Sequence, residues 1–247
     1  MTDVITNQAK AAWFIAGTDT EIGKTLIASA MLHALTKTGV RSAGMKPVAA
    51  GAVLRDGVWH NDDADILAAE ASVALPQELT TPFLLQQPTA PHIAAAQENR
   101  TIEVSHILSC YQQLAQQADA LVVEGVGGFR VPLNDREDTA DLAQQLGLPV
   151  VLVVGLRLGC INHAMLTVEA IAARGLRLAG WVANTADVHM LNGDANITAL
   201  SSRIAAPLLG HVPRMDALPA KALTAAAASH LNFSSLPGWP EPSGNRS

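Results

Sequence analysis

Residues 17–25 read GTDTEIGKT and lie between a short apolar run, WFIA at 13–16, and a stretch with helical periodicity. A strand, a loop ending in Gly-Lys-Thr and a helix form the arrangement of a phosphate-binding loop, in which backbone N–H groups at the helix start bind phosphate oxygens. Counted from Gly17, five residues rather than the usual four precede Gly-Lys-Thr. The pattern predicts a bound nucleotide, with the Lys24 amine on its phosphates and the Thr25 hydroxyl on Mg²⁺. The alternative is a turn that ends in Lys-Thr by chance.

The rest of the chain alternates short apolar runs with longer helical patterns. The predicted strands lie at 13–16, 42–46, 120–124, 150–154, 180–183 and 208–212. The predicted helices lie at 24–37, 64–71, 104–117, 139–146, 161–173 and 197–205. Strands that are apolar on both faces and alternate with helices are typical of a parallel sheet that is covered on both sides. The sequence therefore predicts the α/β class: a doubly wound, mostly parallel sheet with helices on both faces.

We expect a single domain over residues 1–233. The last stretch, 234–247, is rich in Pro, Gly and Ser, and we expect it to be a flexible C-terminal tail.

Composition argues against several kinds of partner. With a net charge of −6 and 4% aromatic residues, the chain lacks the basic and aromatic surface that nucleic acid requires. Its two cysteines, Cys110 and Cys160, have no C-x-x-C spacing, which is typical of a reducing compartment. The N-terminus lacks the order of a signal peptide, and the longest apolar run, at 149–156, is too short to span a bilayer. We expect a cytoplasmic protein with no nucleic-acid and no membrane partner.

A carboxylate and a second lysine are expected near the phosphate loop. Glu124 ends the predicted strand ALVVE, and ligands of open α/β sheets gather at the carboxyl ends of strands. Lys46 stands at the end of the second strand, where a second cation would stabilise charge on a transferring phosphoryl group. For both residues the alternative is a solvated charge at a strand end. The glycines in GVGG, after Glu124, allow the backbone to approach a ligand closely.

Two further stretches are ambiguous on their own. In NDDAD, at 61–65, Asp62 or Asp63 is expected to cap the following helix. In GLRLGCINHAML, at 155–166, a strand exit and a helix start offer free N–H groups that suit a substrate carboxylate. Cys160 is either a nucleophile or a small packing residue, and packing is favoured because no His/Asp pair attends it. The eight histidines show no H-E-x-x-H spacing, so no zinc site is predicted.

Together these motifs resemble the dethiobiotin synthetase family, the ATP-dependent ring-closing enzymes of biotin biosynthesis. The matching stretches run in family order from residue 13 to about 215: GTDTEIGKT, GMKPVAAG, NDDAD, PTAPHIAAAQE, VVEGVGG, VVGLRLGCINHAMLT, GWVAN and APLLGHVP. GTDTEIGKT and LGCINHAMLT are the most specific. The longer phosphate loop is the form that this family uses.

The resemblance implies a P-loop NTPase-like domain that works as a homodimer, with the active site shared across the interface. The implied substrates are 7,8-diaminononanoate (diaminopelargonate), CO₂ and ATP, with Mg²⁺ as the metal. One amine takes up CO₂ to form a carbamate, whose oxygen attacks the γ-phosphate to give a carbamic-phosphoric anhydride. The second amine then closes the ring, and dethiobiotin, ADP and phosphate are the products.

The resemblance also implies roles residue by residue. The metal ligands are Thr25, Asp63 and Glu124, which favours Asp63 over the capping interpretation. The catalytic cations are Lys24 and Lys46. The other ATP-binding residues are Glu21, Ile22, Gly23, Leu26, Gly125, Val126, Gly127, Asn184, Thr185, Pro213, Arg214 and Met215, with Asn184 on the adenine. The substrate-binding residues are Thr20, Lys46, Ala50, Gly159, Cys160, Ile161 and Asn162, the last four contributed by the neighbouring subunit to the substrate carboxylate.

Two positions depart from the family pattern. Ala50 stands where the family commonly has Ser or Thr, so one substrate hydrogen bond is lost or passes to the backbone or to Thr20. Ala220 stands where an acidic residue is often found near the adenine. Neither position belongs to the metal ligands or the two lysines.

Two other protein classes share this style of loop. Amidating synthases of the cobyrinic-acid type usually carry a glutaminase domain, for which 247 residues leave no room. Switch ATPases of the ParA/MinD kind have a lysine near the start of the loop, where this chain has Asp19. Asp19 therefore favours a synthetase over a nucleotide-switched binding protein.

Overall fold

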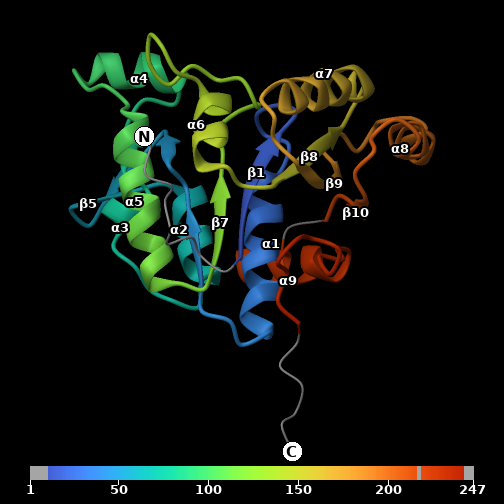
Figure 1. Ribbon diagram of the computed structural model, residues 1–247, viewed down its shortest axis with the longest axis horizontal. Helices are drawn as coiled ribbons and strands as arrows, with labels where there is room; N and C mark the ends of the chain where they lie inside the picture. Colours follow the sequence, from blue (N-terminus) through green and yellow to red (C-terminus); the bar gives the residue numbers. More distant parts are fainter. Residues whose placement is uncertain (1–10, 216–217, 242–247) are drawn as a thin grey trace, which may run out of the picture.

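The computed structural model describes residues 11–215 and 218–241 (Figure 1). Its main sheet has six strands, all parallel, in the order β10-β9-β8-β1-β7-β2. Their bounds are β1 Ala11–Gly17, β2 Ser42–Met45, β7 Ala120–Glu124, β8 Val150–Leu156, β9 Leu178–Thr185 and β10 Leu208–Val212. Each predicted strand is present, and the predicted parallel sheet is confirmed.

Helices cover both faces of this sheet, which confirms the doubly wound architecture. The helices are α1 Lys24–Lys37, α2 Asp62–Glu70, α3 Gln77–Thr80, α4 Pro91–Gln97, α5 Val104–Gln117, α6 Thr139–Leu146, α7 Cys160–Ala173, α8 Gly193–Ser201 and α9 Ala220–Ser229. One buried cluster joins α5, α6, α7 and α8 to the sheet, and a second joins α1, α2 and α9 to the opposite face. α1 and α9 lie side by side on that second face (Figure 1).

The strands are apolar on both faces because both faces are covered. In β1, Trp13 and Ile15 belong to the cluster on the α1 side, whereas Phe14 and Ala16 belong to the opposite cluster. The helical periodicity has the same origin, since Ile27, Met31 and Leu35 in α1 are all fully buried. β1 lies between β7 and β8, so strand order reverses at its carboxyl end. Open α/β sheets bind ligands at such a point.

Several elements differ from the prediction. A small parallel sheet of β3 (Val48–Ala50) and β6 (Phe83–Leu85) and a hairpin of β4 (Val53–Arg55) and β5 (Val58–His60) were not predicted. These strands are each three residues long, too short for a clear alternation pattern. The alanine-rich α9 was also missed, and α8 lies at Gly193–Ser201 rather than at 197–205.

The cap of α2 corrects another expectation. Asn61, not Asp62 or Asp63, caps this helix, because its side chain accepts hydrogen bonds from the N–H groups of Asp63 and Ala64. Asparagine is one of the preferred capping residues, and the acidic residues that follow it suit the positive end of the helix. The Asp63 side chain is therefore free of a capping role.

Part of the predicted tail packs against the sheet. Leu236 is buried, and the Trp239 ring lies 5.3 Å from Trp13 and 4.9 Å from Phe233 between centroids. Burying aromatic surface of this size lowers the free energy of the folded chain. This gain exceeds the cost of ordering a segment rich in Pro, Gly and Ser, whose composition had suggested a flexible tail. Residues 242–247 lie outside the described part of the chain.

Candidate active site

The phosphate loop has the backbone that a ligand-binding loop requires. β1 ends at Gly17, and α1 begins at Lys24 after Gly23, which caps the helix with a φ of 89°. A Cβ on Gly23 would lie 2.3 Å from Nδ2 of Asn184, so both the conformation and the space demand glycine. Glu21 also has a positive φ, of 56°. The N–H groups at the start of α1 are thus presented in a tight turn, at the positive end of the helix dipole.

Two side chains fix this loop from within the protein. Lys24 Nζ donates to the Asp19 carbonyl oxygen at 2.7 Å, which folds the lysine over the loop. Asn184, at the end of β9, donates from Nδ2 to the Ile22 carbonyl oxygen at 2.8 Å. The predicted adenine residue therefore contacts the phosphate loop directly.

A buried charge cluster adjoins the loop. Lys46 Nζ lies 2.5 Å from Glu124 Oε1 and 2.8 Å from Asp63 Oδ2. Thr25 Oγ1 donates to Glu124 Oε1 at 2.8 Å. Lys46 and Glu124 are buried, with 4% and 1% of their side chains exposed, whereas Asp63 is half exposed. The structure thus brings together residues from four separate segments of the sequence, as predicted for Thr25, Lys46, Asp63 and Glu124.

Burial and charge shift the pKa values in this cluster. Burial and the nearby Lys46 ammonium lower the pKa of Lys24 to about 8. Burial alone would lower the pKa of Lys46, but Glu124 and Asp63 outweigh it and raise that pKa. Burial likewise opposes ionisation of Asp63, but Lys46 holds its pKa below the ordinary value. For Glu124 burial dominates over the Lys46 charge, and its pKa is raised.

The residues present fit a magnesium ion. Oε2 of Glu124 is buried and has no hydrogen-bond partner, so a carboxylate oxygen is left for a cation. Two carboxylates and one hydroxyl, from Asp63, Glu124 and Thr25, are oxygen donors of the kind that Mg²⁺ takes beside phosphate and water. In the described residues no group of three or more His, Cys, Asp and Glu side chains forms a metal cage.

The glycine-rich turn after β7 packs against the phosphate loop. A Cβ on Gly125 would lie 3.2 Å from the Ile15 carbonyl oxygen. Gly127 has a φ of 64°, and its Cβ would approach Thr20 Oγ1 to 3.5 Å. Gly127 therefore lies close to the exposed Thr20, and Gly125 lies against β1.

The predicted base-binding residues lie at the ends of β9 and β10. Val212 pairs with Asn184, so Pro213, Arg214 and Met215 leave the sheet beside that asparagine. Thr185 follows Asn184, and its Oγ1 lies 2.9 Å from His211 Nε2. Leu26, by contrast, packs its side chain against the apolar cluster under α1.

The segment predicted to bind the substrate carboxylate begins α7. Gly159 caps this helix with a φ of 94°, and Asn162 in its first turn is exposed. Ile161 is half-buried against the core. Cys160 is buried, and its Sγ donates to Asn196 Oδ1 at 3.9 Å, which agrees with the packing interpretation.

Ala50 ends β3 close to the charge cluster in sequence and in space. Its carbonyl oxygen accepts from Asn61 Nδ2 at 3.1 Å, and Asn61 in turn caps the helix that carries Asp63. Ala50 is half-buried. The other departure, Ala220, is exposed at the first position of α9.

Sequence reasoning missed one contact at the site. The Arg157 guanidinium forms an ion pair with the Asp19 carboxylate, which joins the segment before α7 to the phosphate loop. Both side chains are partly exposed. The only signal in the sequence was the position of each residue at a predicted strand exit, where side chains converge.

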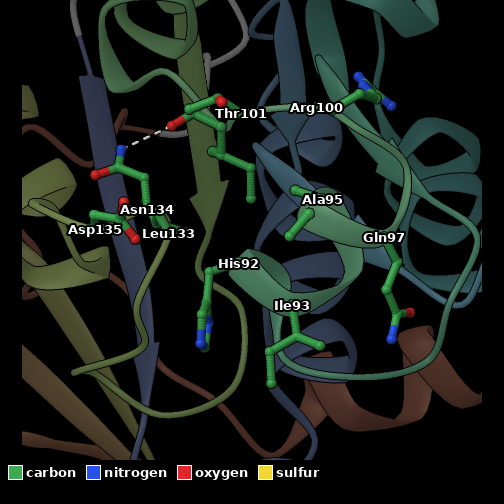
Figure 2. A pocket seen from close by; sticks show the side chains of 11 residues that line it. His92, Ile93, Ala95, Gln97, Arg100, Thr101, Leu133, Asn134 and Asp135 are labelled. Atoms are coloured by element: carbon green, nitrogen blue, oxygen red, sulfur yellow. Dashed lines mark hydrogen bonds between the residues drawn. The ribbon is translucent and has the colours of Figure 1, made fainter.

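A cavity of about 520 Å³ lies elsewhere, between α4 and the turn at 133–135 (Figure 2). His92, Ile93 and Gln97 line it from α4, and Asn134 reaches across to donate to the Ile102 carbonyl oxygen at 2.8 Å. None of the predicted site residues lines this cavity.

The fold is shared with known nucleotide-binding proteins. A ParA family ATPase from Chlorobium tepidum TLS is similar with a TM-score of 0.55 at 15% identity, over 89% of this chain and 90% of that one. A MinC:MinD cell division protein complex from Aquifex aeolicus gives a TM-score of 0.53 at 14% identity, over 88% and 86%. At such low identity the likeness concerns the fold alone. The fold and site together define a P-loop nucleotide-binding protein of the doubly wound α/β class.

Sequence comparisons narrow this class. The family described as AAA domain matches residues 11–222. Two proteins called ATP-dependent dethiobiotin synthetase BioD are similar: that of Janthinobacterium sp. (strain Marseille), 58% identical over 92% of this chain and 97% of its own, and that of Aromatoleum aromaticum (strain DSM 19018 / LMG 30748 / EbN1), 59% identical over 83% and 91%. The chain belongs to the ATP-dependent dethiobiotin synthetase family and is thus an ATP-dependent synthetase.

Proposed function

We propose that the chain forms dethiobiotin from 7,8-diaminononanoate, CO₂ and ATP in a Mg²⁺-dependent reaction. The observation that carries this proposal is the buried Lys46 ammonium, held between Glu124 and Asp63 beside the phosphate loop. A synthetase that joins two anions, a carbamate and a nucleotide phosphate, needs fixed cations between them. Lys24, in the phosphate loop, and Lys46, in the adjoining charge cluster, supply two such cations.

The proposed reaction has three balanced steps. One substrate amine adds to CO₂, loses a proton and becomes a carbamate. A carbamate oxygen attacks the γ-phosphorus, ADP leaves, and a carbamic-phosphoric anhydride remains. The second amine attacks the anhydride carbonyl carbon and loses a proton, the ring closes as a cyclic urea, and phosphate leaves.

The residues of the chain orient and neutralise these groups. Lys46 keeps its proton, because Glu124 and Asp63 raise its pKa, so it acts as a fixed positive charge toward the carbamate and the transferring phosphoryl group. Lys24, now folded onto the Asp19 carbonyl, moves onto the phosphates when nucleotide enters. Thr25, Asp63 and Glu124 hold Mg²⁺, which when bound neutralises charge on the β- and γ-phosphates.

Recognition of the diamine is proposed to involve both subunits of a homodimer. Thr20, Lys46 and Ala50 surround the amine end, and Gly159, Cys160, Ile161 and Asn162 of the neighbouring subunit bind the carboxylate at the start of α7. Two apolar residues near that segment are exposed: Leu158, just before α7, and Leu166, within α7, with 94% and 58% of their surface exposed. Apolar surface of this kind beside a polar binding segment supports a subunit interface there.

The adenine is proposed to lie against Asn184 and Thr185 and the segment Pro213–Met215. Asn184 uses Nδ2 for the phosphate loop, which leaves its Oδ1 to accept from the adenine amino group. Because Ala50 has no hydroxyl, its carbonyl and the nearby Thr20 take over the missing substrate hydrogen bond.

In the described part of the chain no helix is long and apolar enough to cross a membrane. A cytoplasmic location stays a proposal, drawn from the sequence.

The decisive experiment measures phosphate release from ATP and Mg²⁺ by the purified protein. We expect release only when bicarbonate and 7,8-diaminononanoate are both present, with dethiobiotin formed in equal amount. Release that ignores the diamine and responds to DNA or to lipid vesicles would contradict the proposal and return the chain to the switch ATPases.

A further inference from the structure

The helix that carries Asp63 is attached to the protein by few apolar contacts. Within α2, which the structure describes throughout, the buried residues are Ala64, Leu67 and Glu70. They form a stripe at three-residue spacing, the face that a helix normally packs against its neighbours. The last member of this stripe is a carboxylate instead of an apolar side chain. A buried carboxylate needs a hydrogen-bond partner, so the partner of Glu70 helps to determine the position of α2 and of Asp63.

That partner is His33 of α1. His33 Nδ1 lies 3.0 Å from Glu70 Oε2, and their side chains are 17% and 6% exposed. His33 Nε2 is buried and has no hydrogen-bond partner, which favours the proton on Nδ1, where it is donated to Glu70. Thr36, one turn further along α1, donates from Oγ1 to the Glu70 carbonyl oxygen at 3.2 Å. Both contacts join the end of α2 to the phosphate-loop helix.

The spacing of these contacts matches the spacing of the metal ligands. Along α1, His33 stands eight residues after Thr25, and along α2, Glu70 stands seven residues after Asp63. Both separations are about two helical turns, or roughly 10–12 Å. At the other level the Thr25 hydroxyl donates to Glu124, and Lys46 holds both Glu124 and Asp63, so Thr25 and Asp63 belong to one charge cluster. α1 and α2 therefore meet at two levels, one at the proposed magnesium site and one two turns away.

We propose that the His33–Glu70 hydrogen bond is a positioning contact that fixes α2 along α1, and so holds Asp63 where it completes the magnesium site with Thr25 and Glu124. The inference rests on the magnesium site of the proposed function. His33 and Glu70 touch neither nucleotide nor metal. The chain after α2 is also tied, since the Ser42 N–H donates to Ser72 Oγ at 2.7 Å, but this bond joins it to β2 and not to α1.

The test removes the hydrogen bond while keeping the volume. Glu70→Leu deletes the acceptor, and Glu70→Gln keeps an oxygen that accepts from His33. The first readout is the affinity for a non-hydrolysable ATP analogue, measured by calorimetry over a range of Mg²⁺ concentrations; the second is the Mg²⁺ midpoint of phosphate release. Because partners behind metal ligands tune metal affinity, we expect Glu70→Leu to raise both midpoints about tenfold and Glu70→Gln about twofold or less. Glu103→Gln, an exposed acid at the start of α5, serves as the matched control and leaves both unchanged.

A double variant of His33 and Glu70 tests independently whether the two side chains act through one hydrogen bond. His33→Leu should raise the midpoints as much as Glu70→Leu does, and the double variant should shift them no further, because the two side chains act through one bond. If Glu70→Leu does not fold, His33→Leu makes the same comparison. Mg²⁺ midpoints within twofold of wild type in folded Glu70→Leu or His33→Leu overturn the proposal. This holds even where the thermal unfolding midpoint falls, because the pair then only stabilises the fold.

Failure of the proposed function gives a different result. Binding of the analogue requires no diamine. A protein whose Mg²⁺-dependent binding weakens in Glu70→Leu, but which never forms dethiobiotin, contradicts the proposed reaction and leaves the positioning contact standing.

Discussion

At the scale of single residues, the site depends on charges that have been removed from water. A buried lysine remains charged only when carboxylates lie beside it, and Lys46 has two, Glu124 and Asp63. The sequence predicted that Lys46 and Glu124 meet, because strand ends converge at one edge of a parallel sheet, and the family resemblance implied that Asp63 joins them. It did not predict their degree of burial, which depends on the packing of the whole crevice.

Replacing Lys46 tests its role in the chemical step. Lys46→Ala should lower kcat by about 10²–10⁴-fold, because the lost cation faces charge that develops during transfer, while the ATP analogue still binds. Steady-state kinetics and calorimetry measure the two effects. Lys37→Ala, at the exposed end of α1, is the control. A normal kcat in folded Lys46→Ala would show that Lys46 is a buried structural charge with no part in the chemical step.

The pKa of Lys24 predicts a pH dependence of nucleotide binding. This pKa is lowered to about 8, so the free protein carries the Lys24 charge below that pH and loses it above. Binding to phosphate needs the protonated amine, so the affinity for the ATP analogue should be flat below pH 8 and fall by up to about tenfold per pH unit above it. Titration calorimetry from pH 7 to about 9.5 measures this. An affinity that does not change over this range shows that Lys24 keeps its proton or makes no phosphate contact.

At the scale of elements, the phosphate loop is set by its glycines. Gly23 has a φ of 89°, and an added Cβ would lie 2.3 Å from Asn184 Nδ2. Gly23→Ala should therefore weaken binding of the ATP analogue about tenfold or more, since the left-handed conformation alone costs an alanine about 1–2 kcal/mol. Gly193→Ala, whose Cβ would meet nothing within 4 Å, is the control. Equal binding by the two variants would show that the loop adapts.

The central helices and strands were predictable from sequence, whereas the short elements were not. Ile27, Met31 and Leu35 repeat at helical spacing because one stripe of α1 is buried, so its bounds at Lys24–Lys37 agree with the prediction. The strands Val48–Ala50 and Phe83–Leu85 are too short to show a period, and they exist because they pair with each other. Such pairing is a property of tertiary structure, which a local pattern does not contain.

In the candidate site, too, residues within local motifs were predictable from sequence, whereas contacts that depend on tertiary structure were not. Thr25, Lys46, Asp63 and Glu124 each lie in a short motif, and the structure brings these four together. The Asp19–Arg157 ion pair and the His33–Glu70 contact join residues whose pairing no local motif predicts. The cap of α2 did have a local signal, because Asn61 is a preferred capping residue followed by three acidic residues. The cap was nevertheless predicted at Asp62 or Asp63.

At the scale of the whole molecule, the proposed dimer makes a sharp prediction. If the site takes Lys46 from one subunit and Asn162 from the other, Lys46→Ala and Asn162→Ala should complement each other after mixing through a denatured or dissociated state. A mixed dimer then holds one intact and one doubly defective site, so random pairing restores about a quarter of wild-type activity. Turnover at a diamine concentration well below KM measures the recovery. No recovery, with mixed dimers present, excludes a shared site.

The packing of the C-terminal segment predicts a stability effect. Trp239 lies against Trp13 and Phe233, so Trp239→Ala should lower the free energy of unfolding by about 2 kcal/mol. Denaturant titration measures the loss. Ser235→Ala, exposed in the same segment, is the control. A change of less than about 0.5 kcal/mol would show that the segment contributes no packing energy.

The contact between Trp13 and Trp239 also bears on the order of events during synthesis. β1 is made first among the described strands and bears the phosphate loop, yet its Trp13 ring packs against Trp239, which is made after all the described strands and helices. Domains fold as units once their contacts are available. The nascent chain therefore lacks one of the Trp13 contacts until about residue 239 has emerged, and the strand that bears the phosphate loop completes its packing only then.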